Sequence, residues 1–472
     1  MTLDSFRKEC KWSSLASDPR PLLYGRGSVP SHNRKGVVGR CAVALLALFI
    51  AVPATAQEAP ADARARAKAV RDYGRQGGSA IIPKLAGYLS DPDLDVRVEA
   101  VKAIVDIGTQ YSLEPLTRAL DDIDPEIQIR ATDGLVNFYL PGYVKTGGGL
   151  TSSLRRAGSA IRSRFTDTND QIIDQWIQVR PEVISGLGKV ARGGASMDSR
   201  ANAARAIGVL RGRSAIPDLI EALRSKDDQV IYEALIALQK IHDPAAAPAI
   251  EFLLRDPVDR IQATALETAG LLQDRAALPQ ARDALDHARS TKIRRAALEA
   301  VALMADASVH DVLRTWLTNK DDALRGSAAE GLGRLKDPGD TPALEKMFSD
   351  EAKTSSRLAA AFALAEMGKL DMTALAPLRY LVNNLNMAAW RGVARPYLVE
   401  LARDPAVRQT LYPALALKDA TRDEKTGLAE VLAASGSADS IPPLETLSRD
   451  PDPEVAQAGL RALQAVKART AN

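Results

Sequence analysis

One stretch of the sequence decides the fold: residues 96–108, which read Val-Arg-Val-Glu-Ala-Val-Lys-Ala-Ile-Val-Asp-Ile-Gly. Apolar side chains recur in it at helical spacing, and Gly108 closes it. The small residues Ala100 and Ala103 stand among branched ones. Short side chains let two helices approach closely, while branched neighbours fill the space beside the crossing. The stretch therefore predicts an amphipathic helix that packs tightly against other helices.

This pattern recurs along the chain, mostly at steps of 31 or 32 residues. Its equivalents pair a branched and a small residue at Ile127 and Ala131, Val230 and Ala234, Ile261 and Ala265, Ile293 and Ala297, and Leu324 and Ala328. A second motif, Ile-Pro-x-Leu at residues 82–85, 216–219 and 441–444, opens a preceding helix, because proline is tolerated in the first helical turn. Polar breaks rich in Asp and Pro separate the two helices.

A two-helix unit is too small to bury its apolar face alone, and stacked neighbours close a continuous core. We therefore predict an all-α fold, an α-solenoid of about ten stacked two-helix repeats. These residues resemble the HEAT repeat family and, in the shortness of the unit, the HEAT-like repeats of the phycobilisome lyases. The resemblance implies a structural arginine that pairs with an interhelical Asp, at Arg97, Arg200, Arg294, Arg325 and Arg357. Gln128, Ile231 and Gln262 replace it in three units, whose turns we expect to be ordered differently.

The N-terminus reads as an export signal. Residues 41–52 are apolar and uncharged, basic residues precede them, and Ala54-Thr55-Ala56 follows. We predict cleavage after Ala56 and a periplasmic or secreted protein, because the alternative, a membrane anchor, needs about 20 apolar residues. The long stretch before the signal predicts a later start, at Val29, Val37 or Val38. Without residues 1–56 the chain is nearly neutral and holds no cysteine.

The period also divides the chain into segments. We expect a capping segment at 57–78, HEAT-like repeats at 79–140 and 196–472, and one non-repeat helical insert at 141–195. The insert contains an amphipathic helix whose polar faces carry Arg155, Arg156, Arg162 and Arg164, and it also contains Trp176. Such a helix can contact an acidic partner or an anionic membrane surface, or it can pack on the flank of the solenoid with its charges in water. The insert itself is either a recognition element or a tolerated insertion.

A second irregular stretch spans residues 375–423 and includes Trp390 and Arg391. A tryptophan beside an arginine is typical of an interface hot spot, and it equally serves to fill a gap between longer helices. The candidate partner-binding residues are thus Arg155, Arg156, Arg162, Arg164, Trp176, Trp390 and Arg391.

Common catalytic motifs are absent from the sequence. The histidines after the predicted signal, His242, His287 and His310, are far apart in the chain, and His310 stands where Pro83 and Pro217 stand in their units. We therefore predict no catalytic residue, cofactor or metal. The expected function is a non-enzymatic scaffold that binds a protein or peptide, and not nucleic acid. The alternative is a phycobilisome-lyase-like enzyme or a tetrapyrrole-binding solenoid, against which an export signal argues. The sequence determines neither the partner nor the oligomeric state.

Overall fold

The computed structural model describes residues 62–143, 171–174, 176–417 and 420–471. The predicted export signal and the four arginines at 155–164 lie outside the described residues. All regular secondary structure in the described ranges is helical, so the predicted all-α class is confirmed. Within these ranges, no helix has both the length and the hydropathy that a membrane crossing requires.

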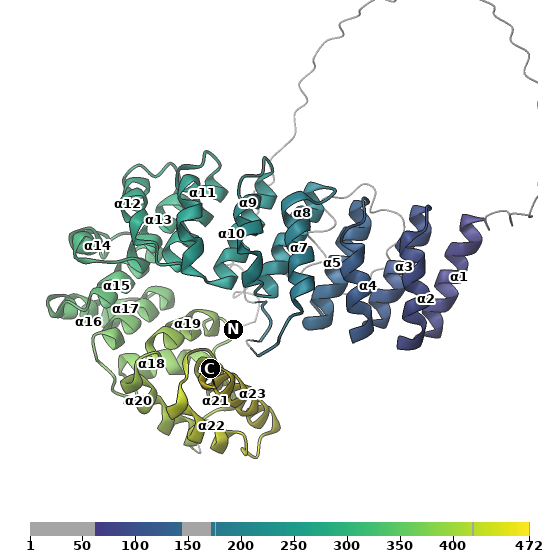
Figure 1. The fold of residues 1–472 in the computed structure, drawn as a ribbon. Coiled ribbons are helices and arrows are strands. Elements are labelled where there is room, and N and C mark those ends of the chain that lie inside the picture. Colours follow the sequence, from purple (N-terminus) through teal and green to yellow (C-terminus); the bar gives the residue numbers. More distant parts are fainter. Residues whose placement is uncertain (1–61, 144–170, 175, 418–419, 472) are drawn as a thin grey trace, which may run out of the picture. The chain divides into compact units, whose positions relative to one another are not determined.

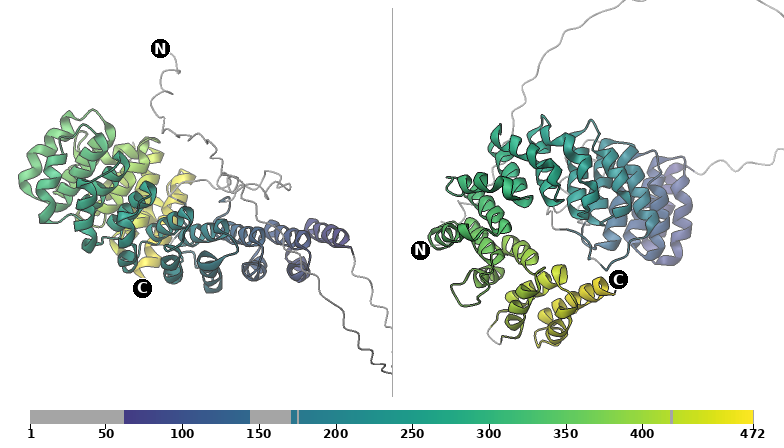
Figure 2. Two further views of the ribbon diagram at one scale, coloured as in Figure 1. Left: turned by 90° about the horizontal axis from the view of Figure 1, so that it is seen from above. Right: turned by 60° about the vertical axis from the view of Figure 1, so that its left-hand side comes forward.

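Helices in the described part of the chain form two layers. The second-helix layer consists of α1 (Ala63–Gln76), α3 (Leu94–Ile107), α5 (Pro125–Tyr139), α8 (Met197–Val209), α10 (Asp228–Ile241), α11 (Asp259–Leu271), α13 (Thr291–Leu303), α15 (Asp322–Leu335), α17 (Thr354–Glu366), α19 (Arg391–Leu401), α21 (Arg422–Ser435) and α23 (Pro453–Thr470). Each of these packs against the next in this order, as Figures 1 and 2 show.

Each second helix after α1 is preceded in the chain by one helix of the first-helix layer. This layer consists of α2 (Ile82–Gly87), α4 (Leu113–Ala119), α7 (Pro181–Gly193), α9 (Ile216–Ala222), the 3₁₀-helix η7 (Pro244–Arg255), α12 (Leu278–Asp286), α14 (His310–Trp316), α16 (Thr341–Asp350), α18 (Pro377–Asn383), α20 (Pro405–Ala416) and α22 (Ile441–Leu447). Short 3₁₀ turns flank several of them, at Ser79–Ile81, Tyr88–Ser90, Gln110–Ser112, Arg213–Ala215, Arg275–Ala277, Ala307–Val309, Pro338–Asp340, Asn384–Asn386 and Ala438–Ser440. The alternation of the two layers is the predicted α-solenoid.

Small residues make the tight crossings between second helices, as the sequence predicts. Ala234 and Ala265 have no exposed surface. At Gly333 in α15 an added Cβ would lie 2.4 Å from the Cα of Ala363 in α17, and at Gly208 it would lie 2.7 Å from the Cα of Ala237. Neither position has room for a methyl group, so the backbones themselves are in contact there.

The repeat arginines mostly serve the structure. Arg97 donates to the carboxylate of Asp122 at 2.8 Å and to the carbonyl of Asp91 at 2.9 Å, and so ties its own turn to the next repeat. Arg325 binds Glu351 and the carbonyl of Asn319 in the same way. Arg357 differs, because its guanidinium lies over the rings of Phe348 and Tyr380.

The two glutamines that replace this arginine, Gln128 and Gln262, also hydrogen-bond to the carbonyls of the turn. The amide of Gln128 donates to the carbonyls of Leu120 and Asp122, and its oxygen accepts from the backbone of Ala195. Gln262 donates to the carbonyl of Leu254 and accepts from Arg289. A neutral amide thus replaces the ion pair while the turn keeps its hydrogen bonds.

Part of the expected insert 141–195 is built like a repeat. Helix α7 begins at Pro181 and packs against α8, as a first helix packs against its second helix. Residues 144–170 lie outside the described residues, so the other boundaries of the insert stay predictions.

Candidate functional site

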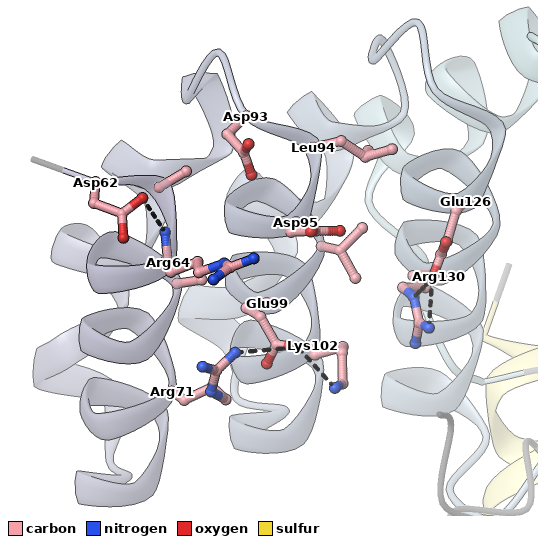
Figure 3. Close-up of a pocket in the computed structure, with 13 residues that line it drawn as sticks. Asp62, Arg64, Arg71, Asp93, Leu94, Asp95, Glu99, Lys102, Glu126 and Arg130 are labelled. Atoms are coloured by element: carbon pink, nitrogen blue, oxygen red, sulfur yellow. Dashed lines mark hydrogen bonds and ion pairs between the residues drawn. The ribbon is translucent and has the colours of Figure 1, made fainter. Parts of the chain in front are cut away.

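A pocket of about 760 Å³ lies on the second-helix layer near the N-terminal end of the described chain. Helices α1, α3 and α5 line it, and Figure 3 shows their side chains converging on it. The lining residues are Asp62, Ala63, Arg64, Ala67, Arg71, Asp93, Leu94, Asp95, Val98, Glu99, Lys102, Glu126 and Arg130. The capping aspartates Asp62 and Asp93 begin α1 and α3, so ordinary helix capping places two of the carboxylates.

The basic side chains of this pocket differ in how firmly they are held. Arg130 is buried and bound to Glu126, with its Nε at 3.0 Å and its Nη2 at 2.7 Å from the same carboxylate oxygen. Glu99 is shared by Lys102 at 3.2 Å and Arg71 at 3.9 Å. Arg64 is exposed, and among the described residues its guanidinium makes no ion pair. A ligand carboxylate can therefore recruit Arg64 and Arg71 without breaking a strong contact.

The pocket also has an apolar wall, formed by Ala63, Ala67, Leu94 and Val98. The other nine lining residues are ionisable, five of them acidic and four basic, so charged groups dominate the pocket. The apolar wall beside the basic side chains can take an elongated ligand that carries carboxylates.

A second cluster of ionisable groups joins α13, α15 and α19. Arg334 binds Glu400 through two parallel hydrogen bonds of 2.8 and 2.9 Å and lies 3.4 Å from Glu330. The hydroxyl of Tyr397 donates to Glu330 at 2.6 Å, and its ring stacks on buried Phe362. These contacts reach from α15 past α17 to α19 and stabilise that stretch of the solenoid.

Two carboxylates of this cluster, those of Glu330 and Glu299, are hard to ionise. Burial raises the pKa of Glu330, although Arg334 and Tyr397 oppose the shift. Crowding by protein atoms, together with the charges of Glu330 and Glu267, raises the pKa of Glu299 to about 8. The side chain of Glu299 is nevertheless exposed, and the water that reaches it moderates this shift. The pKa of Glu299 is thus raised above the ordinary value of a glutamate, on a side chain that water can reach.

The described candidates from the sequence belong to neither cluster, although Trp390 and Arg391 begin the helix α19 that carries Tyr397 and Glu400. Trp176, shortly before α7 in the chain, is half-buried. Trp390 is half-buried against the C-terminal core, which fits the gap-filling interpretation. Arg391 is held internally, by the carbonyl of Leu385 at 2.7 Å and by Asp423 at 2.7 Å. Partner binding by these residues and by Arg155, Arg156, Arg162 and Arg164 stays a prediction.

Sequence reasoning missed both clusters, although a signal for the second was present. Glu267, Glu299 and Glu330 recur at steps of 32 and 31 residues, the period of the repeat itself. The N-terminal pocket had no such signal, because its charges come from two helix caps and three different helices.

Comparison with known proteins gives one curated relative at moderate identity. The α subunit of phycocyanobilin lyase from Picosynechococcus sp. is 32% identical over 172 residues, which span 34% of this chain and 63% of the relative. The matched part is thus less than two thirds of that protein.

Solved structures are more distant. A chain of the CpcE–CpcF complex of phycocyanin lyase from Nostoc sp. PCC7120 is 20% identical, with 64% of this chain and 92% of that chain covered and a TM-score of 0.31. Importin beta is 14% identical, with 86% and 66% covered and a TM-score of 0.34. Identities and TM-scores this low carry no argument about function.

The relative corrects one expectation from the sequence. The choice of a non-enzymatic scaffold is wrong, because the curated relative is named as a lyase subunit and favours the lyase-like alternative instead.

The family itself is established by the repeats. The profile described as HEAT repeats matches residues 53–136, 184–270 and 278–365, more than half of the chain. Solenoids of this kind generally mediate protein interactions. With its two-layer architecture, its turn arginines and its tight glycine crossings, the chain belongs to the HEAT repeat family.

Proposed function

We propose that this chain is a lyase-type HEAT-repeat protein that holds an open-chain tetrapyrrole and presents it to a protein. The observation that carries the proposal is the 32% identity, over 172 residues, to the α subunit of phycocyanobilin lyase. That relative's name supplies the substrate class and the kind of reaction.

The N-terminal pocket supports the proposal on chemical grounds. A bilin is an elongated, conjugated and mostly apolar molecule with two propionate groups. The pocket volume of about 760 Å³ falls in the usual range for ligands of that size, roughly 300–1,000 Å³. The apolar wall fits the pyrrole rings, and Arg64 and Arg71 fit the propionates, because their guanidinium groups are weakly engaged within the described chain.

The partner in this proposal is the protein that accepts or releases the pigment. A solenoid offers an extended surface for such a protein beside the pocket. The formal net charge of +3 on 472 residues offers no broad electrostatic footprint for nucleic acid. Export also stays a proposal: residues 41–56 predict it, and the intact mass of the mature chain tests it, with a product that begins at Gln57 expected.

Binding of phycocyanobilin by the purified full chain tests the proposal. Titration should shift and sharpen the visible absorption of the pigment, and the double variant Arg64→Ala, Arg71→Ala should weaken binding about tenfold or more, because two charge-assisted contacts are lost. Arg75→Ala is the matched control, since Arg75 is an exposed arginine of the same helix that does not line the pocket.

Two results count against the proposal. If the wild-type chain leaves the spectrum of the pigment unchanged, the function is wrong. If it binds the pigment and the double variant binds equally well, the pocket is not the site.

A further inference from the structure

The last residue of the 3₁₀ turn before a first helix is buried in the described repeats that have such a turn, except in the first, where Ile81 is half-buried. In six described repeats that residue is no more than 1% exposed: Ser112, Ala215, Ala277, Val309, Asp340 and Ser440. Alanine and valine need no partner there, and the serines have one, since Ser112 donates to the carbonyl of Ile104 and Ser440 bonds the hydroxyl of Tyr412. Asp340 alone in this set brings a charge, so it requires compensation.

The charge of Asp340 is compensated by a residue of the preceding repeat, and that residue is also unusual for its position. The first residue of the first helix is Ile82, Leu113, Ile216, Leu278, Thr341 or Ile441 in other units, and in α14 it is His310. The structure thus aligns His310 with Ile82 and Ile216, one residue earlier than the prolines with which the sequence aligned it. The two unusual residues face each other: Nε2 of His310 lies 2.8 Å from Oδ2 of Asp340.

A third ligand-type side chain completes the group. Asp337 caps the turn through Oδ1, which accepts from the backbone of Gly339 at 2.8 Å. Its other oxygen, Oδ2, lies 3.5 Å from Nε2 of His310. One nitrogen and two carboxylate oxygens therefore gather within 4.8 Å of one another, from two adjacent repeats.

One oxygen of this group is left without a hydrogen bond. Oδ1 of Asp340 is buried and accepts none within the described chain, and its nearest cation is Nε of Arg314 at 3.4 Å. The side chain of Arg314 is 54% exposed and can move into solvent. A buried carboxylate with a free lone pair beside an imidazole is a donor set that suits a metal ion better than it suits a single hydrogen bond.

We propose that His310, Asp337 and Asp340 bind a divalent transition-metal ion such as Zn²⁺, which ties the repeat of α14 to the repeat of α16. An imidazole with carboxylates suits zinc and its first-row neighbours better than magnesium or calcium, and the ligand distances to zinc, about 2.0–2.2 Å, need only small shifts of the three atoms. The half-exposed Asp337 leaves the solvent side open for water. The proposal is independent of the proposed function.

Calorimetric titration of the untagged, chelator-treated full chain with Zn²⁺ tests the proposal. One equivalent should bind at micromolar concentration. Asp337→Asn and His310→Gln should each weaken this binding about tenfold or more, and Arg314→Ala should strengthen it severalfold, because a competing cation beside Asp340 is removed.

The control is His287→Gln. His287 lies 3.2 Å from a single carboxylate, that of Asp283, and should bind no zinc of its own. Binding at millimolar Zn²⁺ only, or binding that both site variants retain, would overturn the proposal. Since Asp337 is 51% exposed, Asp337→Asn still decides the matter if His310→Gln impairs folding.

Discussion

Gly333 offers a sharp test of the repeat packing. In Gly333→Ala the new methyl carbon would lie 2.4 Å from the Cα of Ala363 and 2.7 Å from its Cβ, where carbon atoms normally rest at about 3.5–4.0 Å. Since the obstacle is the backbone of α17, no rotamer change relieves the clash, and the two helices must separate by roughly 1 Å. Overpacking of this kind costs about 1–3 kcal/mol.

Gly326 in the same helix is the matched control. Its added Cβ would meet Ala359 at 3.6 Å, an ordinary contact. Gly326→Ala should therefore be neutral or stabilise the helix by up to about 1 kcal/mol, through the lower backbone entropy of alanine in the unfolded chain.

Hydrogen exchange read by mass spectrometry is the suitable assay, because a long repeat array does not unfold in one step. Peptides of α15 and α17 should exchange faster in Gly333→Ala, by a factor that corresponds to the lost free energy, and should be unchanged or slower in Gly326→Ala. Equal exchange in the two variants would refute the assignment of tight crossings to these glycines.

Three further variants test the ion pairs and ionisable groups. Arg97→Ala should reduce the protection of α3 and α5 against hydrogen exchange by an amount that corresponds to about 1.5–3 kcal/mol, because Arg97 is 13% exposed and holds Asp122 of the next repeat, and a loss below about 0.5 kcal/mol would contradict its structural role. Glu299→Gln should stabilise the fold above pH 8 and change little at pH 4, since crowding by protein atoms and neighbouring carboxylates raise the pKa of Glu299 and its ionised form is the costly one; a pH-independent effect would be inconsistent with this. The hydrogen bond to Asp340 raises the pKa of His310, so with chelator present this contact stabilises the fold fully below the unfolded pKa of about 6.5 and loses its effect as pH rises through the folded pKa. His310→Gln should therefore destabilise more at pH 5.5 than at pH 9, and the reverse order would disprove it.

The repeat architecture could be predicted because the same pattern of apolar and small residues recurs many times in the sequence. Each of the positions equivalent to Ala100 and Gly108 repeats the same packing constraint, so the period survives the loss of any one signal. The glutamines that replace the repeat arginine show where prediction from the repeat pattern fails. Gln128 was expected to order its turn differently, and yet its amide reaches the same kind of turn carbonyl that Arg97 reaches.

The candidate sites could not be predicted in the same way, since they depend on which side chains of different repeats face one another. Arg64 and Glu99 line one pocket across two helices, and nothing in their spacing marks them as a pair. The sequence analysis singled out His310 but not Asp340, and only the structure shows that the two side chains lie 2.8 Å apart. The choice between scaffold and lyase was also beyond the sequence pattern, because both classes use the same solenoid.

Size-exclusion chromatography of the full chain after incubation with phycocyanobilin tests the central claim most directly. Protein and pigment should elute together, with visible absorption under the protein peak in wild type and in Arg75→Ala, and with that absorption much reduced in the Arg64→Ala, Arg71→Ala variant. A wild-type protein peak without visible absorption would contradict the claim that this HEAT-repeat chain handles a tetrapyrrole.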